Sequence, residues 1–275
     1  MTVGIGVLAS DKSKPDHVIL IADTQGSFEG EYSMDRLYKI FKFPEISLYA
    51  TCCNRVDRAA ELMPIIVANL KAQSASSHGD CQRIICQAAF DYKLQRFMLD
   101  VLPRYPLQPA DWQKQWLQLA DQKLKQEVID AWQQFDIGCD LIIGAFDGAT
   151  DQAFLYALYG SGQFGNFSFP GFTAIGSGEN NAMFWLSYRN HHLGKSIERS
   201  AYEAYEAKIM AERSAFVNDD IHLLVANKRE HFELHKQVGK NEVQGCPISL
   251  TNLTEQFKKY GPQDTGALDP NKRHY

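Results

Sequence analysis

The order of strand-like and helical runs constrains the fold of this 275-residue chain more than any single motif does. The N-terminal part contains four short runs typical of β-strands, at Val3–Leu8, Val18–Ala22, Tyr38–Phe43 and Ile46–Thr51. A polar, proline-containing segment separates the first two runs and predicts a hairpin loop. Because such connections are too short for crossover helices, these strands favour an antiparallel sheet over βαβ units.

The middle third has the apolar spacing of helices. Residues 58–72 and 81–102 follow this pattern, and Pro64 is expected to kink the first helix or to end one of its segments. A Trp-rich segment, about 104–135, continues the helical pattern. Its tryptophans favour packing in a core or interface over a cofactor site.

Strand-like runs return after the Trp-rich segment and are again followed by helical runs. The strands are expected at 139–146, 152–160 and 172–178, the helices at Glu179–Tyr188 and Ser196–Glu212, and a last strand at Asp220–Asn227. Alternating groups of strands and helices predict an α+β chain with helices outside two stacked sheets. We expect one domain over 1–235 and a polar C-terminal tail over 236–275, where periodicity is weak.

Charge and composition argue against several classes of protein. The net charge is −5, and the basic residues are scattered rather than clustered, so neither nucleic acid nor an anionic membrane is expected as a partner. We find no apolar run near the roughly 18 residues of a membrane span and no secretory signal pattern. The cysteines form no C-x-x-C pair, which argues against a zinc site and favours reduced thiols in a cytoplasmic protein.

Two further motifs have simple structural interpretations. "GSGQFG" at 160–165 spells G-x-G-x-x-G, but "NFSFPGF" follows it and does not start a helix, so a hairpin loop is favoured over a dinucleotide site. His191 and His192 are adjacent and do not share one face of a helix, which argues against a common metal site.

Five stretches, taken in order, resemble a known family. They are Thr2 at the start of "TVGIGV", "IADTQG", "YKI" with its lysine sixteen residues after Asp23, "AIGSGENNA" and "DIHLLVAN". Over most of residues 2 to 227 the chain resembles the proteasome β-subunit and the HslV-type peptidase, which are N-terminal-nucleophile (Ntn) hydrolases. Relative to this family, the Trp-rich segment at about 104–135 is expected to be a helical insertion. The resemblance implies a four-layer αββα sandwich of two antiparallel sheets flanked by helices.

The resemblance also implies a nucleophile at the N-terminus. Removal of Met1 would make Thr2 the first residue, and its hydroxyl would attack a carbonyl while its own α-amine takes the proton. A free α-amine has a pKa of about 7.7–8.0, so it is a suitable general base near neutral pH. Neither a metal nor a cofactor is implied.

Four other residues match positions of the family's site. By resemblance, Lys39 would lie near the Thr2 hydroxyl, Asp23 would hold Lys39, and Ser177 would lie near the terminal amine. The oxyanion would be bound by a backbone N–H near Cys53. Two departures occur: Cys53 and Asn54 replace a glycine pair, and Ser214 and Val217 replace the Asp and Ser found in proteasome subunits.

Two functions are therefore open. The first is a threonine-type peptidase or amide hydrolase acting on peptides or unfolded proteins, in a homo-oligomeric ring that an AAA+ unfoldase feeds. The second is a catalytically silent proteasome-like subunit that serves as a scaffold or binding partner. Alone, Thr2 is an ordinary strand start, so its interpretation as a nucleophile depends on Asp23, Lys39 and Ser177 occurring with it.

Overall fold

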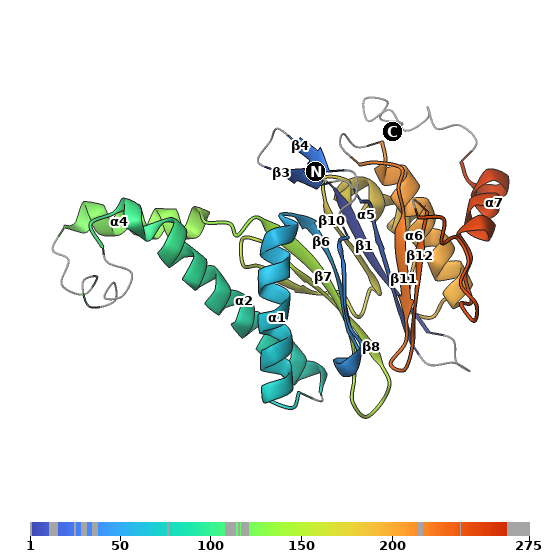
Figure 1. Ribbon diagram of the computed structural model, residues 1–275, viewed down its shortest axis with the longest axis horizontal. Coiled ribbons are helices and arrows are strands. Elements are labelled where there is room, and N and C mark those ends of the chain that lie inside the picture. Colours follow the sequence, from blue (N-terminus) through green and yellow to red (C-terminus); the bar gives the residue numbers. More distant parts are fainter. Residues whose placement is uncertain are drawn as a thin grey trace.

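Two five-stranded sheets stack face to face in this computed structural model (Figure 1). The first has the order β10-β1-β2-β11-β12 and is formed by β1 (Val3–Ala9), β2 (His17–Ala22), β10 (Phe172–Gly176), β11 (His222–Ala226) and β12 (His231–His235). The second has the order β5-β6-β7-β8-β9 and is formed by β5 (Ile40–Phe43), β6 (Leu48–Asn54), β7 (Cys139–Phe146), β8 (Ala153–Leu158) and β9 (Phe164–Asn166). All neighbouring strands in these sheets are antiparallel.

Helices cover both outer faces of this pair of sheets (Figure 1). On one face lie α1 (Val56–Ala72) and α2 (His78–Asp100), and on the other lie α5 (Glu179–Tyr188) and α6 (Ile197–Ala211), with α7 (Leu250–Tyr260) beside α6. Helix α4 (Gln122–Gln134) lies away from the sheets, and short 3₁₀ turns occur at Pro44–Ile46 and Leu102–Arg104. A small hairpin joins β3 (Gly26–Phe28) to β4 (Tyr32–Met34). The structure describes residues 2–10, 16–24, 26–28, 32–34, 38–75, 77–107, 114, 116, 121–213, 217–236 and 238–262.

Three apolar layers hold the sandwich together. One lies between the first sheet and α5, α6 and α7, a second between the other sheet and α1 and α2, and a third between the two sheets. The layers therefore run helix, sheet, sheet, helix. This confirms the predicted α+β fold with two antiparallel sheets flanked by helices.

Glycines let the two sheets approach closely. Val3, Ile5 and Val7 of β1 pack in the helix-side layer, so Gly4 and Gly6 face the second sheet. A Cβ at Gly6 would lie 2.7 Å from Ile142 and 2.9 Å from Leu155. The alternating sequence "VGIGV" thus forms a strand that places bulky residues on the helix side and only glycines on the side of the second sheet.

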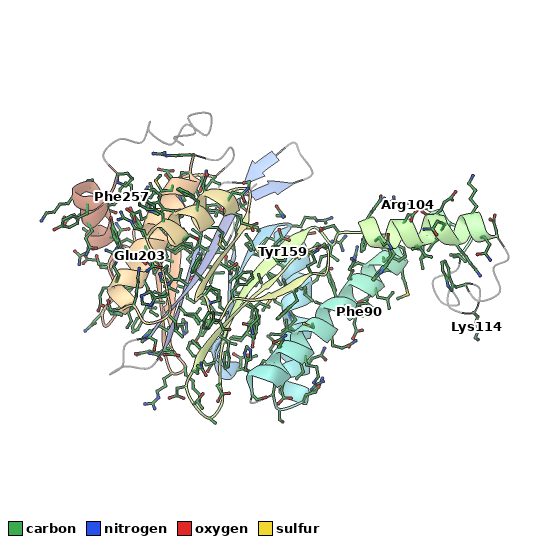
Figure 2. All side chains as sticks on the ribbon, turned by 180° about the vertical axis from the view of Figure 1, so that it is seen from behind. Phe90, Arg104, Lys114, Tyr159, Glu203 and Phe257 are labelled. Carbon is green, nitrogen blue, oxygen red and sulfur yellow. The ribbon has the colours of Figure 1, made fainter. Side chains whose placement is uncertain are left out.

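A buried acidic residue on α6 anchors the helical layer of the first sheet (Figure 2). The Glu203 carboxylate is fully buried and binds His191 Nδ1 at 2.8 Å, Lys195 Nζ at 2.7 Å and Arg199 Nε at 2.7 Å. Burial alone would raise the pKa of Glu203, but these three hydrogen bonds outweigh it and lower the pKa to about 2. His191 therefore has a structural partner inside the helical layer.

The Glu203 cluster is expected to make stability depend on acid pH. Because the pKa of Glu203 is lower in the folded chain than the ordinary 4.5, its stabilising contribution is present above pH 4.5 and is lost as the pH falls toward 2. We expect a loss of about 3 kcal/mol across this window, measured by urea unfolding at a series of pH values. Glu203→Gln should flatten that part of the profile, whereas Glu198→Gln, at an exposed position on α6, should not. If the free energy of unfolding of Glu203→Gln fell at acid pH as it does in the natural chain, Glu203 would not be the source of the acid dependence.

The predicted insertion forms part of a helical arm that extends from the sandwich (Figure 1). Phe90, Arg104 and Lys114 lie along this arm (Figure 2). Its helices α2 and α4 share a separate apolar cluster that includes Phe97, Val128, Trp116 and Trp132. Trp116 and Trp132 thus pack in a core, as predicted, while Trp112 lies outside the described residues.

Several elements differ from the sequence-based predictions. Helix α1 continues through Pro64, which lies on its exposed face, where water can satisfy the carbonyl that loses its partner. Strand β12 and helix α7 were not predicted. Helix α7 lies within the segment expected to be a polar tail and contributes Leu250 and Leu253 to the core beside α6. Short apolar stripes of this kind gain their stability from packing rather than from local periodicity.

Other sequence-based interpretations agree with the structure. Residues 160–165 form the turn between β8 and β9 and the start of β9, as expected for a hairpin loop. All six cysteines are free. A search of the described residues found no candidate for a membrane-spanning helix.

Candidate active site

Thr2 lies directly before β1, at one end of the sandwich. The residue is 1% exposed, and its hydroxyl has no hydrogen-bond partner among the residues that the structure describes. Strand β1 pairs with β10 so that Val3 lies opposite Gly176, which brings the turn after β10 beside Thr2. A buried, unpartnered hydroxyl costs free energy and is the kind of feature that calls for an explanation.

A buried ion pair lies next to Thr2 and joins the two sheets. Asp23 follows the end of β2 in the first sheet, and Lys39 precedes β5 in the second. Lys39 Nζ lies 2.8 Å from Asp23 Oδ1, and both side chains are fully buried. The same carboxylate oxygen accepts the backbone N–H of Val3 at 3.1 Å. The structure therefore brings together three of the predicted site residues, Thr2, Asp23 and Lys39.

The electrostatics of this pair are set mainly by burial. Desolvation raises the pKa of Asp23 above its ordinary value, while the charge and hydrogen bond of Lys39 and the N–H of Val3 oppose the rise. The carboxylate depends on its partners to stay ionised, because an isolated buried charge is strongly disfavoured.

Cys53 projects from β6 into the layer between the sheets and lies against Thr2. Its side chain is fully buried, and its thiol donates to the Ile175 carbonyl at 3.4 Å. Burial raises the pKa of the thiol to about 12, although the charge of Lys39 lowers it in part. The thiol is therefore protonated at neutral pH and is a poor nucleophile.

The predicted oxyanion role of Cys53 concerns its backbone N–H. The N–H of the preceding Cys52 donates to the Lys39 carbonyl at 3.0 Å, toward β5. Amides alternate between the two neighbours along a strand, so the Cys53 N–H is directed toward β7, where its register partner is Asp140. The oxyanion assignment stays a prediction.

The turn after β10 closes the site from the other side. The Ser177 hydroxyl donates to the Thr2 carbonyl at 3.3 Å, so the fourth predicted residue also lies at the site. Gly176 has φ +89°, and a Cβ there would lie 2.1 Å from the Thr2 carbonyl oxygen and 2.8 Å from the Cys53 sulfur. Only glycine combines this backbone conformation with such a close approach.

Gly176→Ala is therefore expected to destabilise the fold by about 3 kcal/mol or more, because a left-handed backbone and a clash with Thr2 act together. Gly239→Ala provides a matched control, since Gly239 has φ +72° with no atom within 4 Å of its added Cβ. The control should lose only about 1 kcal/mol, from backbone strain. Equal losses for the two variants in urea unfolding would show that the contact with Thr2 is unimportant.

The sequence analysis did not predict a polar network that joins Thr24, the residue after Asp23, to the segment before β11. Thr24 Oγ1 donates to Asp220 Oδ2 at 2.9 Å and accepts from Asn218 Nδ2 at 3.3 Å. Lys208 of α6 donates to the Asn218 carbonyl. Nothing in the local pattern of these residues distinguishes them from ordinary loop and helix residues.

The second departure from proteasome subunits concerns Ser214 and Val217, which precede β11 in the sequence. Val217 is largely buried, and Ser214 lies outside the described residues. Within the described part of the chain, no group of three or more His, Cys, Asp or Glu side chains is placed to hold a metal ion.

Comparisons with known proteins identify the fold. No protein-family model matches the sequence, and no curated protein matches it. Among solved structures, a Gly-1 mutant of Anbu from Hyphomicrobium sp. strain MC1 superposes with a TM-score of 0.61 at 13% identity, covering 94% of each chain. Eukaryotic HslV from Trypanosoma brucei superposes with a TM-score of 0.51 at 14% identity, covering 82% of this chain and 99% of HslV. The chain has the fold of the HslV-like, proteasome-type Ntn hydrolases.

Proposed function

We propose that this protein is a threonine-type amide hydrolase whose nucleophile is Thr2, exposed as the N-terminal residue when Met1 is removed. The observation that carries the proposal is the buried Asp23–Lys39 ion pair, because its carboxylate also binds the N–H of Val3, the residue next to Thr2. Apolar residues of similar size can often replace a buried ion pair without loss of stability. The stability of the fold therefore does not by itself explain why this ion pair is present. Its place at the end of β1 supports a role in activating the N-terminus.

The proposed reaction has two halves. The Thr2 hydroxyl oxygen bonds to the carbonyl carbon of an amide while the α-amine of Thr2 takes the hydroxyl proton. When the C–N bond breaks, that proton passes to the leaving amine, and an ester with Thr2 remains. Water then attacks the ester with the same amine as base, which releases the acid and restores the hydroxyl.

Lys39, Asp23 and Ser177 would support this chemistry in different ways. The positive charge of Lys39 near Thr2 favours the neutral amine and stabilises negative charge on the attacking oxygen. Asp23 holds Lys39 in place at 2.8 Å. The Ser177 hydroxyl, which donates to the Thr2 carbonyl at 3.3 Å, fixes the position of the first residue.

We propose peptides or unfolded proteins as substrates and a homo-oligomeric ring as the assembly, supplied by an AAA+ unfoldase. The likeness of the fold to Anbu and HslV supports this proposal at the level of architecture. A cytoplasmic location stays a prediction from the sequence.

Three observations favour the alternative, a catalytically silent subunit. Thr2 is 1% exposed, the Cys53 side chain lies against it, and the Cys53 N–H is directed toward β7. A silent subunit would keep the buried ion pair as a structural link between the two sheets and would act as a scaffold or binding partner.

N-terminal sequencing and intact mass, followed by labelling with a β-lactone, distinguish the two functions. The proposal expects Met1 to be absent and one adduct per chain, which peptide mapping places on Thr2. Thr173→Val, which changes a buried threonine of β10 away from the N-terminus, should label as the natural chain does. A retained Met1 would exclude the hydrolase, and a free Thr2 that forms no adduct would favour the silent subunit.

A further inference from the structure

Lys208 is a fully buried lysine that faces the candidate site from α6. Its Nζ donates to Glu212 Oε1 at 2.6 Å and to the Asn218 carbonyl at 2.6 Å. One ammonium thus joins the end of α6 to the segment before β11. Lysine is almost never fully buried without partners, so this position requires a specific reason.

The segment that Lys208 holds reaches back to Asp23. The Asn218 side chain donates to Thr24 Oγ1 at 3.3 Å, and Thr24 Oγ1 donates to Asp220 Oδ2 at 2.9 Å. Thr24 is the residue after Asp23. A continuous path therefore runs from the Lys208 ammonium through Asn218 and Thr24 to the backbone that carries Asp23.

Lys208 also acts on Asp23 by its charge. Asp23 Oδ2 is buried and has no hydrogen-bond partner in the described structure, whereas Oδ1 binds Lys39 and Val3. The positive charge of Lys208 lowers the pKa of Asp23 and so opposes the larger effect of burial. Two buried cations, on different elements, thus favour the ionised form of this carboxylate.

The charged groups around Lys208 have opposing effects on its pKa. Burial lowers its pKa most, Glu212 and Asp23 raise it, and Lys236 on the outer side lowers it further. Lys236 is about half exposed and pairs with Asp219 at 3.3 Å. Toward the N-terminus, the neighbouring titratable groups are Lys39 and the Cys53 thiol.

We propose that Lys208 is a positioning residue of the proposed hydrolase: it fixes the 217–220 segment against Thr24 and, with Lys39, keeps Asp23 ionised. The inference rests on the proposed function. It assigns to α6 a part in the site that lies outside the Thr2, Asp23, Lys39 and Ser177 set.

The test compares Lys208→Met with the natural chain and with Lys236→Met. Lys236→Met removes a positive charge from the exposed side of the same segment and leaves the path to Thr24 intact. The first measurement is the rate of β-lactone labelling at Thr2 as a function of pH. The second is a ¹³C NMR titration of the Asp23 carboxyl, which requires no activity.

Loss of the Lys208 charge should raise the pKa of Asp23 further. We expect both the acid limb of the labelling rate and the Asp23 titration to move to higher pH in Lys208→Met, so that labelling on that limb is slower than in the natural chain. Lys236→Met should shift both curves less, since its charge is screened by solvent.

Each outcome has a defined meaning. An Asp23 titration that is the same in Lys208→Met and the natural chain would overturn the inference, whatever the rates. If the natural chain forms no adduct, the proposed hydrolase fails, while the NMR titration still decides whether Lys208 controls Asp23. If Lys208→Met does not fold, Thr24→Val breaks the path without removing a charge. That variant should slow labelling and leave the Asp23 midpoint in place, and an unchanged labelling rate would overturn the positioning role.

Discussion

Lys39→Met is expected to lower the free energy of unfolding by about 3–5 kcal/mol, because it leaves the Asp23 carboxylate buried without its main partner. Both side chains of the pair are fully buried, so water cannot replace the lost ammonium. Urea unfolding at neutral pH measures the loss. The destabilisation should shrink at acid pH, where Asp23 becomes protonated and the missing charge matters less.

Two controls separate burial from charge. Lys42→Met removes a partly exposed lysine of β5 that pairs with Glu233 of β12 in the other sheet, and it should cost no more than about 1 kcal/mol. In the Asp23→Asn/Lys39→Met double variant, the buried charge is absent, and much of the stability should return. If the double variant is as unstable as the sum of the two single variants, the pair makes no coupled contribution.

Thr2→Ala is expected to reduce hydrolysis by about 10³-fold or more while leaving the unfolding midpoint nearly unchanged. The Thr2 hydroxyl has no hydrogen-bond partner in the described structure, so its removal should cost little stability. Thr2→Ser keeps the hydroxyl and the α-amine and should retain most of the activity. Initial rates on a fluorogenic peptide provide the measurement.

Cys53→Ala is the matched control for the nucleophile. The Cys53 thiol lies beside Thr2 but is protonated at neutral pH, because burial raises its pKa to about 12. Activity should therefore survive in Cys53→Ala and disappear in Thr2→Ala. The reverse result would transfer the nucleophile to the thiol and refute the proposed mechanism.

Much of the fold was predictable from local patterns. The helix Glu179–Tyr188 and the strand Cys139–Phe146 have the predicted bounds, because periodic apolar spacing reports which face of an element is buried. Strand β12 and helix α7 were not predicted. The five residues of β12 do alternate, with Phe232 and Leu234 between the polar His231, Glu233 and His235, but so short a run with two apolar residues is a weak signal. The stability of α7 depends on Leu250 and Leu253 packing beside α6.

The candidate site likewise has a part that the sequence predicted and a part that it did not. The set of Thr2, Asp23, Lys39 and Ser177 was recognisable because its order and spacing follow a known family. The contacts of Lys208 and Asn218 with the site were not recognisable. They depend on α6 and the segment before β11 meeting Thr24, which is 194 residues away from Asn218 along the chain.

By itself, the sequence determined the order of strands and helices, the glycine-spaced first strand and the sixteen-residue interval between Asp23 and Lys39. These are local properties, set by side-chain periodicity and backbone freedom within a few residues. Only the tertiary structure decided that Lys39 of one sheet reaches Asp23 of the other, that the Cys53 thiol lies against Thr2, and that Lys208 is joined through Asn218 to Thr24. Such contacts arise from how two sheets and their helices pack, and packing depends on the shape of the whole core rather than on any one segment.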